Sequence, residues 1–114
     1  MAETMNGLKR TCYNGTLSTA DLGKEVVLTG WTAKTRNLGS LVFIDLRDRT
    51  GIIQLVFDSE TDSELFKKAA SVRNEYVLAV RGMVRRRAPE AVNAKMKTGE
   101  IEVFVKELRI LNEA

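Results

Sequence analysis

The 114-residue sequence predicts an all-β fold, a small β-barrel of five strands with one helix inserted between the third and fourth strands. Three observations lead to this prediction. Apolar and polar residues alternate in several segments, as they do in strands that bury one face. Two of these segments contain a glycine in mid-strand, where a small barrel bends. Only one segment, near the middle of the chain, spaces its apolar residues as a helix does.

The N-terminal part is predicted to contain only a short helical turn. Residues 1–8 have no periodic pattern and are expected to form a flexible leader, which leaves residues 9–114 as the folded domain. In "TLSTADLGKEV", Ser18 is a suitable N-cap and Gly23 a suitable end for one turn of helix.

The first strand is predicted over residues 25–36, where "EVVLTGWTAKTR" alternates. Trp31 shares a face with Val27 in this pattern, so we expect its ring to lie in the core rather than on a binding surface. Gly30, in the middle of the strand, indicates a bend or a bulge.

The second and third strands are predicted on either side of a turn, in "LVFIDLRDRTGIIQLVF" (residues 41–57). One face of the second strand is an ordinary apolar core face. The other face is unusual because it places an aromatic ring, Phe43, in line with a carboxylate and a guanidinium. The charged residues beside the turn alternate in sign and are expected to form a local network of ion pairs: Asp45, Arg47, Asp48 and Arg49.

The second half of the chain is predicted to hold the helix and two more strands. "SETDSELFKKAASVRNE" places acids first, apolar residues at helical spacing and bases last, which predicts a helix over about residues 62–72. A fourth strand is expected over residues 76–87, followed by a loop over residues 88–99. The fifth strand begins at "EIEVFV" and is expected to continue, with a kink, through "LRIL".

This element order, β-β-β-α-β-β, is that of the OB-fold, a partly open Greek-key barrel that binds ligands on the outer face of its second and third strands. Phe43 and Gln54 are predicted on those strands, where a ring can stack on a base and an amide can bond to a base edge. Lys34 and Arg36 end the first strand beside the same surface and could hold phosphates. Two alternatives stay open: Phe43 covers one end of the barrel beneath a loop, and Gln54 is a surface residue without a ligand.

The composition favours a binding protein over an enzyme. The chain has no histidine and one cysteine, which excludes a histidine-based triad, an internal disulfide and a multi-cysteine zinc site. Residues 73–97 carry seven basic residues against two acidic ones, a pattern typical of phosphate contacts and equally of a solvated surface. Of the arginine run on the fourth strand, only Arg85 and Arg87 can share the ligand side. No apolar run approaches the ~20 residues that span a bilayer, so we expect no membrane contact and a cytoplasmic location.

Five motifs together resemble one family: "KRTCYNGTL", "VVLTGW", "LGSLVFIDLRDRTGIIQLVF", "VRNEYVLAVRGMVR" and "TGEIEV". They are similar to the N-terminal anticodon-binding domain of bacterial-type aspartyl-tRNA synthetase, in the same order, from about Leu8 to Ala114. "LRDRTG" alone is shared with the synthetases for asparagine and lysine. Its combination with "TGEIEV" is more specific to the bacterial aspartate enzyme.

The resemblance implies roles for single residues. Phe43 matches the aromatic residue that stacks on an anticodon base, and Gln54 matches the glutamine that recognises the central uracil. Glu102 matches the carboxylate that recognises the guanine at the first position, which suits a group that accepts from two N–H donors. Asn93, in the loop after the fourth strand, is the corresponding expectation for the third base.

The sequence departs from the family pattern after the tryptophan. Many members carry three arginines and an aspartate there, whereas this chain has "TAKTRN". Thr35 replaces the middle arginine and Asn37 replaces the acid. We expect Lys34 and Arg36 to keep their phosphate contacts, although a lysine lacks the planar fork of an arginine.

The resemblance also implies a larger parent enzyme, an ATP-dependent aspartate–tRNA ligase. Its class II catalytic domain, with sites for ATP and Mg²⁺, would follow this chain, in which we expect no catalytic residue and no cofactor. The expected partner is the anticodon stem-loop of tRNA(Asp); the parent is expected to be a homodimer and the excised domain a monomer. The alternatives are a free-standing OB-fold that binds single-stranded nucleic acid, the anticodon domain of an asparaginyl-tRNA synthetase, and an OB domain with a protein partner.

Overall fold

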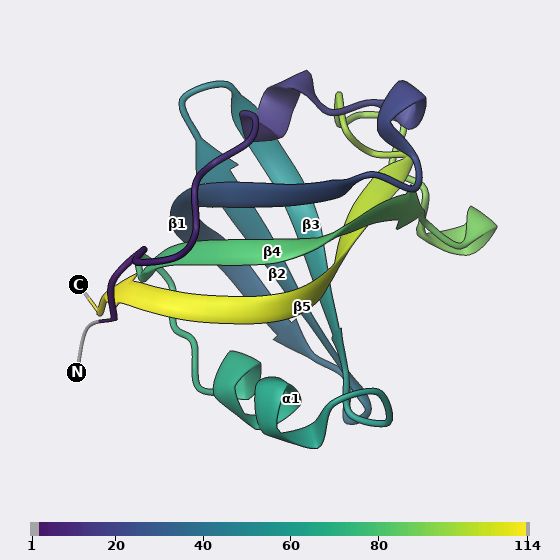
Figure 1. The fold of residues 1–114 in the computed structure, drawn as a ribbon. Coiled ribbons are helices and arrows are strands. Elements are labelled where there is room, and N and C mark those ends of the chain that lie inside the picture. The colour runs from purple at the N-terminus through teal and green to yellow at the C-terminus, as the bar shows by residue number, and fades with distance from the viewer. Residues whose placement is uncertain (1–2, 114) are drawn as a thin grey trace.

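The alternating segments form five strands of one closed barrel (Figure 1). A computed structural model of the chain describes residues 3–113. The strands are β1 (Glu25–Asn37), β2 (Leu41–Asp48), β3 (Gly51–Asp58), β4 (Val77–Arg86) and β5 (Ile101–Asn112). Their order around the barrel is β1-β2-β3-β5-β4, and β4 pairs with β1 to complete the ring. The predicted strand order with one inserted helix is confirmed.

The barrel closes through one short parallel pairing. β3 and β5 pair only at Leu55↔Val103 and Val56↔Phe104, whereas the other neighbouring strands are antiparallel over longer stretches. This junction brings Gln54 of β3 next to Glu102 of β5.

Two glycines allow the long strands to bend. A Cβ at Gly82 would meet the carbonyl oxygen of Phe104, and one at Gly30 would meet that of Arg47. The pairing of β4 with β5 is irregular directly beside Gly82, and β1 has a bulge between Thr32 and Lys34. An irregularity therefore lies directly beside Gly82, and the bulge predicted at Gly30 lies slightly farther along β1, which pairs with β4 along one half and with β2 along the other.

The prediction that Trp31 lies in the core is wrong. Its side chain lies outside the barrel and is 37% exposed. The alternation in β1 is as predicted, but the face that points inward is the other one, with Val26, Leu28 and the fully buried Thr32. The physical reason is the close approach at Gly30, whose absent side chain lets β2 fill the interior there. The indole is left on the outside.

The rest of the core follows the predicted faces. Alternate residues of β2 and β3 point inward and are at most 1% exposed: Val42, Ile44, Leu46, Ile53, Leu55 and Phe57. Helix α1 (Ser63–Ala70) covers one end of the barrel with Ala69 and the half-buried Leu65 and Phe66 (Figure 1). It begins at Asp62, whose side chain accepts a 3.0 Å hydrogen bond from the Leu65 N–H. The short helical turn predicted at Ser18 is also present, as η2 (Thr19–Asp21).

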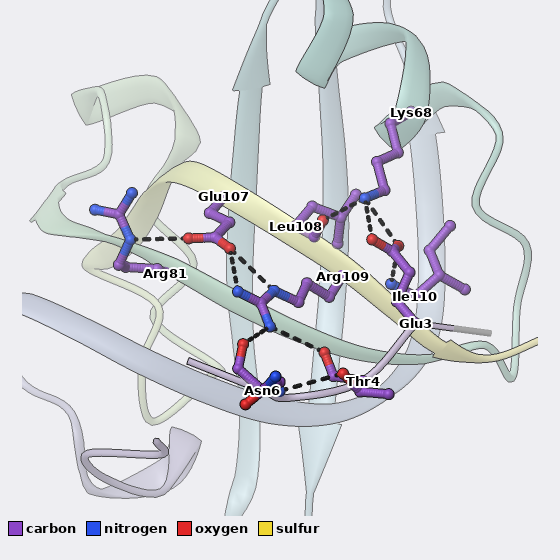
Figure 2. Close-up of polar contacts among 9 residues, drawn as sticks. All are labelled: Glu3, Thr4, Asn6, Lys68, Arg81, Glu107, Leu108, Arg109 and Ile110. Carbon is purple, nitrogen blue, oxygen red and sulfur yellow. Dashed lines mark hydrogen bonds and ion pairs between the residues drawn. The ribbon is translucent and has the colours of Figure 1, made fainter. Parts of the chain in front are cut away.

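The N-terminal segment lies against β5 (Figure 2). The Glu3 N–H donates to the Ile110 carbonyl at 2.7 Å, and the Glu3 carboxylate accepts from the Ile110 N–H at 2.8 Å and pairs with Lys68 at 2.8 Å. Arg109 donates to the Thr4 carbonyl at 3.0 Å. Of the leader expected over residues 1–8, Met1 and Ala2 lie outside the described residues, and the remainder makes these specific contacts. No helix within residues 3–113 is long and apolar enough to cross a membrane.

Candidate nucleic-acid interface

The outer face of β2 and β3 forms the floor of a hollow of about 480 Å³. The turn after β1 and the loop between β4 and β5 form its walls. Six of the eight residues predicted for the site line this hollow: Lys34, Arg36, Phe43, Gln54, Arg87 and Asn93. The structure therefore brings together side chains from four parts of the sequence in one concave surface.

Phe43 lies on the outer face of β2 and is half-buried. Arg36, its cross-strand partner on β1, places its guanidinium 5.0 Å from the centre of the ring. This is a cation–π contact, which holds the arginine beside the ring at the floor of the hollow. An aromatic face and a cation are thus presented together, as a base and its phosphate would require.

Gln54 and Glu102 form a buried pair at the junction of β3 and β5. Gln54 is 2% exposed and Glu102 is 6% exposed. The Gln54 Nε2 donates to Glu102 Oε1 at 3.0 Å, and Gln54 Oε1 accepts from Arg36 Nη2 at 3.2 Å. Glu102 Oε2 accepts from Arg85 Nε at 2.7 Å. The four side chains make one chain of hydrogen bonds across β1, β3, β5 and β4, in which each polar end has a partner.

The chemistry of these neighbours fixes the orientation of the Gln54 amide. A guanidinium can only donate and an ionised carboxylate can only accept, so the amide oxygen must face Arg36 and the amide nitrogen must face Glu102. Gln54 is therefore not the surface residue of the alternative prediction, since its side chain is buried in this network, while its contact with a ligand stays a prediction.

Arg85 and Arg87 have different surroundings although both come from the end of β4. Arg85 stacks on Phe104, with 4.5 Å from the guanidinium carbon to the ring centre, and pairs with Glu102. It does not belong to the lining of the hollow. The predicted phosphate contact of Arg85 stays a prediction.

Arg87 is buried and holds the backbone around it. Its Nε donates to the Ile101 carbonyl at 2.9 Å and its Nη1 to the Ala91 carbonyl at 3.3 Å. Burial lowers the pKa of Arg87 from its ordinary value, while the nearby carboxylates of Asp45 and Glu102 act to raise it. The guanidinium keeps its charge, because an arginine does not lose its proton in the ordinary pH range. Arg87 thus adds a fixed positive charge to the hollow and anchors the β4–β5 loop; its phosphate contact stays a prediction.

Asn93 stands in that loop, exposed at the rim of the hollow. Its N–H donates to the Gly99 carbonyl at 3.0 Å, and its side-chain oxygen accepts from the Lys95 N–H at 3.1 Å. Its side-chain amide nitrogen makes no hydrogen bond within residues 3–113. Met96 lines the hollow as well and was not predicted; the sequence signal was a single long apolar residue between two lysines in a polar loop.

The expected ion-pair network beside the β2–β3 turn is wrong. No ion pair joins Asp45, Arg47, Asp48 and Arg49 in the described part of the chain. Asp48 instead accepts hydrogen bonds from the Asn14 N–H at 2.8 Å and from the Thr50 N–H at 2.8 Å. Its carboxylate binds the backbone of the turn, which leaves the neighbouring arginines without a carboxylate partner.

Comparison with known proteins agrees with this geometry. Residues 26–111 match the family described as "OB-fold nucleic acid binding domain" (tRNA_anti-codon). The chain is 55% identical over its full length to the aspartate–tRNA(Asp/Asn) ligase of Thermoanaerobacter pseudethanolicus and 54% identical to the aspartate–tRNA ligase of Ruminiclostridium cellulolyticum. It spans 19% of the length of each of these relatives.

A solved structure gives the same fold. In a crystal structure of asparaginyl-tRNA synthetase from Pyrococcus horikoshii, the match has a TM-score of 0.77 and 28% sequence identity, and it covers 93% of this chain and 23% of that one. The resemblance and the fold class predicted from the sequence are both confirmed. Because the family match extends over most of its residues, the chain belongs to the OB-fold nucleic acid binding domain family.

Proposed function

We propose that this chain is the anticodon-binding domain of an aspartate–tRNA ligase and that it binds the anticodon stem-loop of tRNA(Asp) in the hollow over β2 and β3. The observation that carries the proposal is the ordered pair formed by Gln54, which lines that hollow, and Glu102, which accepts a 3.0 Å hydrogen bond from the Gln54 amide nitrogen. A glutamine and a carboxylate with fixed polarity form a surface that can distinguish base edges, which a generic strand binder does not need.

In this proposal each anticodon base contacts a different side chain of the hollow or its surroundings. Phe43 provides a stacking face, Gln54 recognises the central uracil and Glu102 recognises the guanine at the first position. Asn93 recognises the third base from the rim. The bases must compete with contacts that exist already, since Gln54 and Glu102 bond to each other and to two arginines. The network holds both side chains in place before the RNA arrives, which reduces the entropy lost on binding.

The cations around the hollow hold the RNA backbone. Lys34 and Arg36 contact phosphates from the end of β1, and Arg85 and Arg87 do so from the end of β4. Phosphate contacts set the position of the RNA on the surface, and base contacts supply the specificity.

The catalytic part of the proposed parent enzyme lies outside this chain. There ATP and Mg²⁺ would support attachment of aspartate to the acceptor end of the tRNA, in a cytoplasmic homodimer. The domain contributes by orienting a bound tRNA, so that correct anticodons add to the specificity of the distant reaction.

The test is the affinity of a 17-nucleotide anticodon hairpin with the sequence GUC, compared with the same hairpin carrying a changed central base. We expect GUC to be preferred and Gln54→Ala to remove the preference, a change of about 1–3 kcal/mol in discrimination. Equal binding of both hairpins by the unmodified protein would instead indicate a generic single-strand binder. No binding of either hairpin would contradict an RNA-binding role.

A hairpin with the anticodon GUU tests whether the domain also accepts the anticodon of tRNA(Asn). Among the relatives, one is named for tRNA(Asp/Asn) and another for aspartate alone. The two anticodons differ at the third base, near the exposed Leu38 and Asn93. We propose the strict form, which requires weaker binding of GUU than of GUC. Equal affinities would assign this chain to the dual-specificity form.

A further inference from the structure

A second hollow extends the outer face of β2 beyond the first one. It has a volume of about 250 Å³ and lies between the β2–β3 turn and the β4–β5 loop. Arg47 lines it from β2, in line with Phe43 of the first hollow, because alternate residues of a strand share a face. Lys97 lines it from the opposite loop, and Met96 lines both hollows. The two hollows are therefore consecutive parts of one surface.

The cations of this region have no carboxylate partner. Within residues 3–113, no ion pair is formed by Arg47, Arg49 or Lys97. On β4 and β5, by contrast, cations such as Arg81 pair with nearby glutamates. The acid that stands closest in sequence, Asp48, already accepts hydrogen bonds from the N–H groups of Asn14, Thr50 and Gly51 and from the Thr50 hydroxyl. Within residues 3–113, positive charge is thus left without an ion-paired carboxylate here, as it is at Lys34 and Arg36 beside the first hollow.

One of these cations is also held in position. Tyr13 is stacked between two guanidinium groups, with ring-centre distances of 4.0 Å to Arg10 and 4.7 Å to Arg49. Its hydroxyl oxygen accepts a hydrogen bond from each of them, at 2.7 Å from Arg10 and 3.0 Å from Arg49. The tyrosine orients both guanidiniums without neutralising them, and most of their N–H donors are left for an anion. A preorganised cation binds a phosphate with less loss of side-chain entropy.

We propose that Arg47, Arg49 and Lys97 form a phosphate-binding track that holds the backbone of the RNA stem next to the anticodon loop. The proposal rests on the proposed function, which places the loop bases in the first hollow. The nucleotides that leave that hollow past Met96 then meet exposed cations rather than base-recognising groups. The track contributes affinity and register but no sequence preference.

The test compares the double variant Arg47→Gln/Lys97→Gln with the unmodified chain, using the GUC hairpin at several salt concentrations. Neither side chain makes a hydrogen bond or an ion pair within residues 3–113, so the substitutions leave the fold intact. The matched control is Lys67→Gln/Arg73→Gln, which removes the same charge on and just after α1. We expect the slope of log affinity against log salt to fall by about 2 in the track variant, at ~0.9 for each phosphate contact, and to stay unchanged in the control.

Adding Arg49→Gln should lower the slope further, while the preference for GUC over the hairpin with a changed central base stays the same. A slope equal to that of the unmodified chain would overturn the track and leave the proposed function standing if Gln54→Ala still removes the preference. A lower slope in a protein without any base preference would support the track and contradict the proposed function. Absence of hairpin binding by the unmodified chain would overturn both.

Binding of a single-stranded RNA of seven nucleotides, with the sequence of the anticodon loop, shows whether the track contacts the stem or the loop. If the track holds the stem, the triple variant and the unmodified chain bind this loop with equal affinity and equal salt dependence. Weaker binding of the loop by the triple variant would show contacts to the loop backbone and overturn the assignment to the stem.

Discussion

Glu100 and Glu102 are two residues apart, yet the barrel gives them different chemical surroundings. Glu100 is exposed and lies 3.9 Å from Arg86 across open surface. Glu102 is 6% exposed and binds both Gln54 and Arg85. The pattern of the sequence alone does not separate these two acids, because both precede apolar residues in the same alternating segment. Burial at the β3–β5 junction makes Glu102 the ordered carboxylate.

This difference in surroundings predicts that two conservative substitutions, Glu102→Gln and Glu100→Gln, have different effects on base preference. Glu102→Gln replaces an acceptor by a donor against the guanine edge, so the preference for guanine at the first anticodon position should fall by about 1–3 kcal/mol. Glu100→Gln should leave the preference unchanged. Hairpins that differ only at that base measure the effect. A Glu102→Gln protein that still prefers guanine to the same extent would remove Glu102 from the recognition of that base.

The sequence predicts the residue types of the site better than their mutual contacts. Phe43 and Gln54 could be identified because they interrupt the expected pattern of outward-facing strand residues. The bonds of Arg87 to the Ile101 and Ala91 carbonyls could not be predicted, because they depend on the path of an irregular loop. The same holds for the Tyr13 stack, which joins side chains 36 residues apart.

At the scale of the elements, alternation of apolar and polar residues predicts where the strands lie. It does not always predict which face of a strand points into the barrel. β1 carries apolar side chains on both faces, so the pattern could not decide whether Trp31 or Leu28 points inward. The close contact at Gly30 decides it, and that contact depends on a strand that follows later in the chain. The faces of β2 were predicted correctly because only one of them is apolar throughout.

Glycines in the barrel and in its turns should respond differently to substitution. Gly82→Ala would push a methyl group against the Phe104 carbonyl and leave only 2.8 Å to the Val103 Cγ1, so we expect a loss of about 3 kcal/mol in the free energy of unfolding. The control is Gly39→Asn, in the β1–β2 turn. There the φ angle is +87°, the surrounding space is open and asparagine tolerates this conformation, so the loss should stay below about 1 kcal/mol.

Urea unfolding of both variants measures the difference. Equal losses in the two variants would contradict the close packing of β4 on β5 as the reason for glycine at position 82.

At the scale of the whole molecule, carboxylates join the N-terminal segment and β5 to the rest of the barrel (Figure 2). Hydrogen bonds from Arg109 lower the pKa of Glu107 below its ordinary value of 4.5, and Arg81 adds to the effect. Burial alone would raise the pKa of Glu3, but the Ile110 N–H and Lys68 together hold it below its ordinary value. Both groups bind protons less readily in the folded chain than in the unfolded one.

The stability of the fold should therefore depend on pH in one direction. The contribution of these carboxylates is complete above their ordinary pKa of 4.5 and is lost as the pH falls through the lowered folded values, because the unfolded chain takes up protons first. Glu107→Gln should make the decline with acid shallower. Glu60→Gln, at an exposed carboxylate without an ion pair in residues 3–113, should leave the decline unchanged. Thermal unfolding between about pH 3 and about pH 7, a range that includes the titration of ordinary carboxyl groups, measures how steeply the stability of each variant declines.

The short parallel pairing of β3 with β5 also bears on how the protein is made. Gln54 precedes Glu102 by 48 residues, so its amide nitrogen leaves the ribosome well before the carboxylate that accepts its hydrogen bond. Leu55 and Val103 can join only once the final strand has emerged, and the same event brings the glutamine and the glutamate together. The nascent chain would thus order Gln54 and Glu102, the two side chains proposed to recognise bases, in one late step, when the barrel closes.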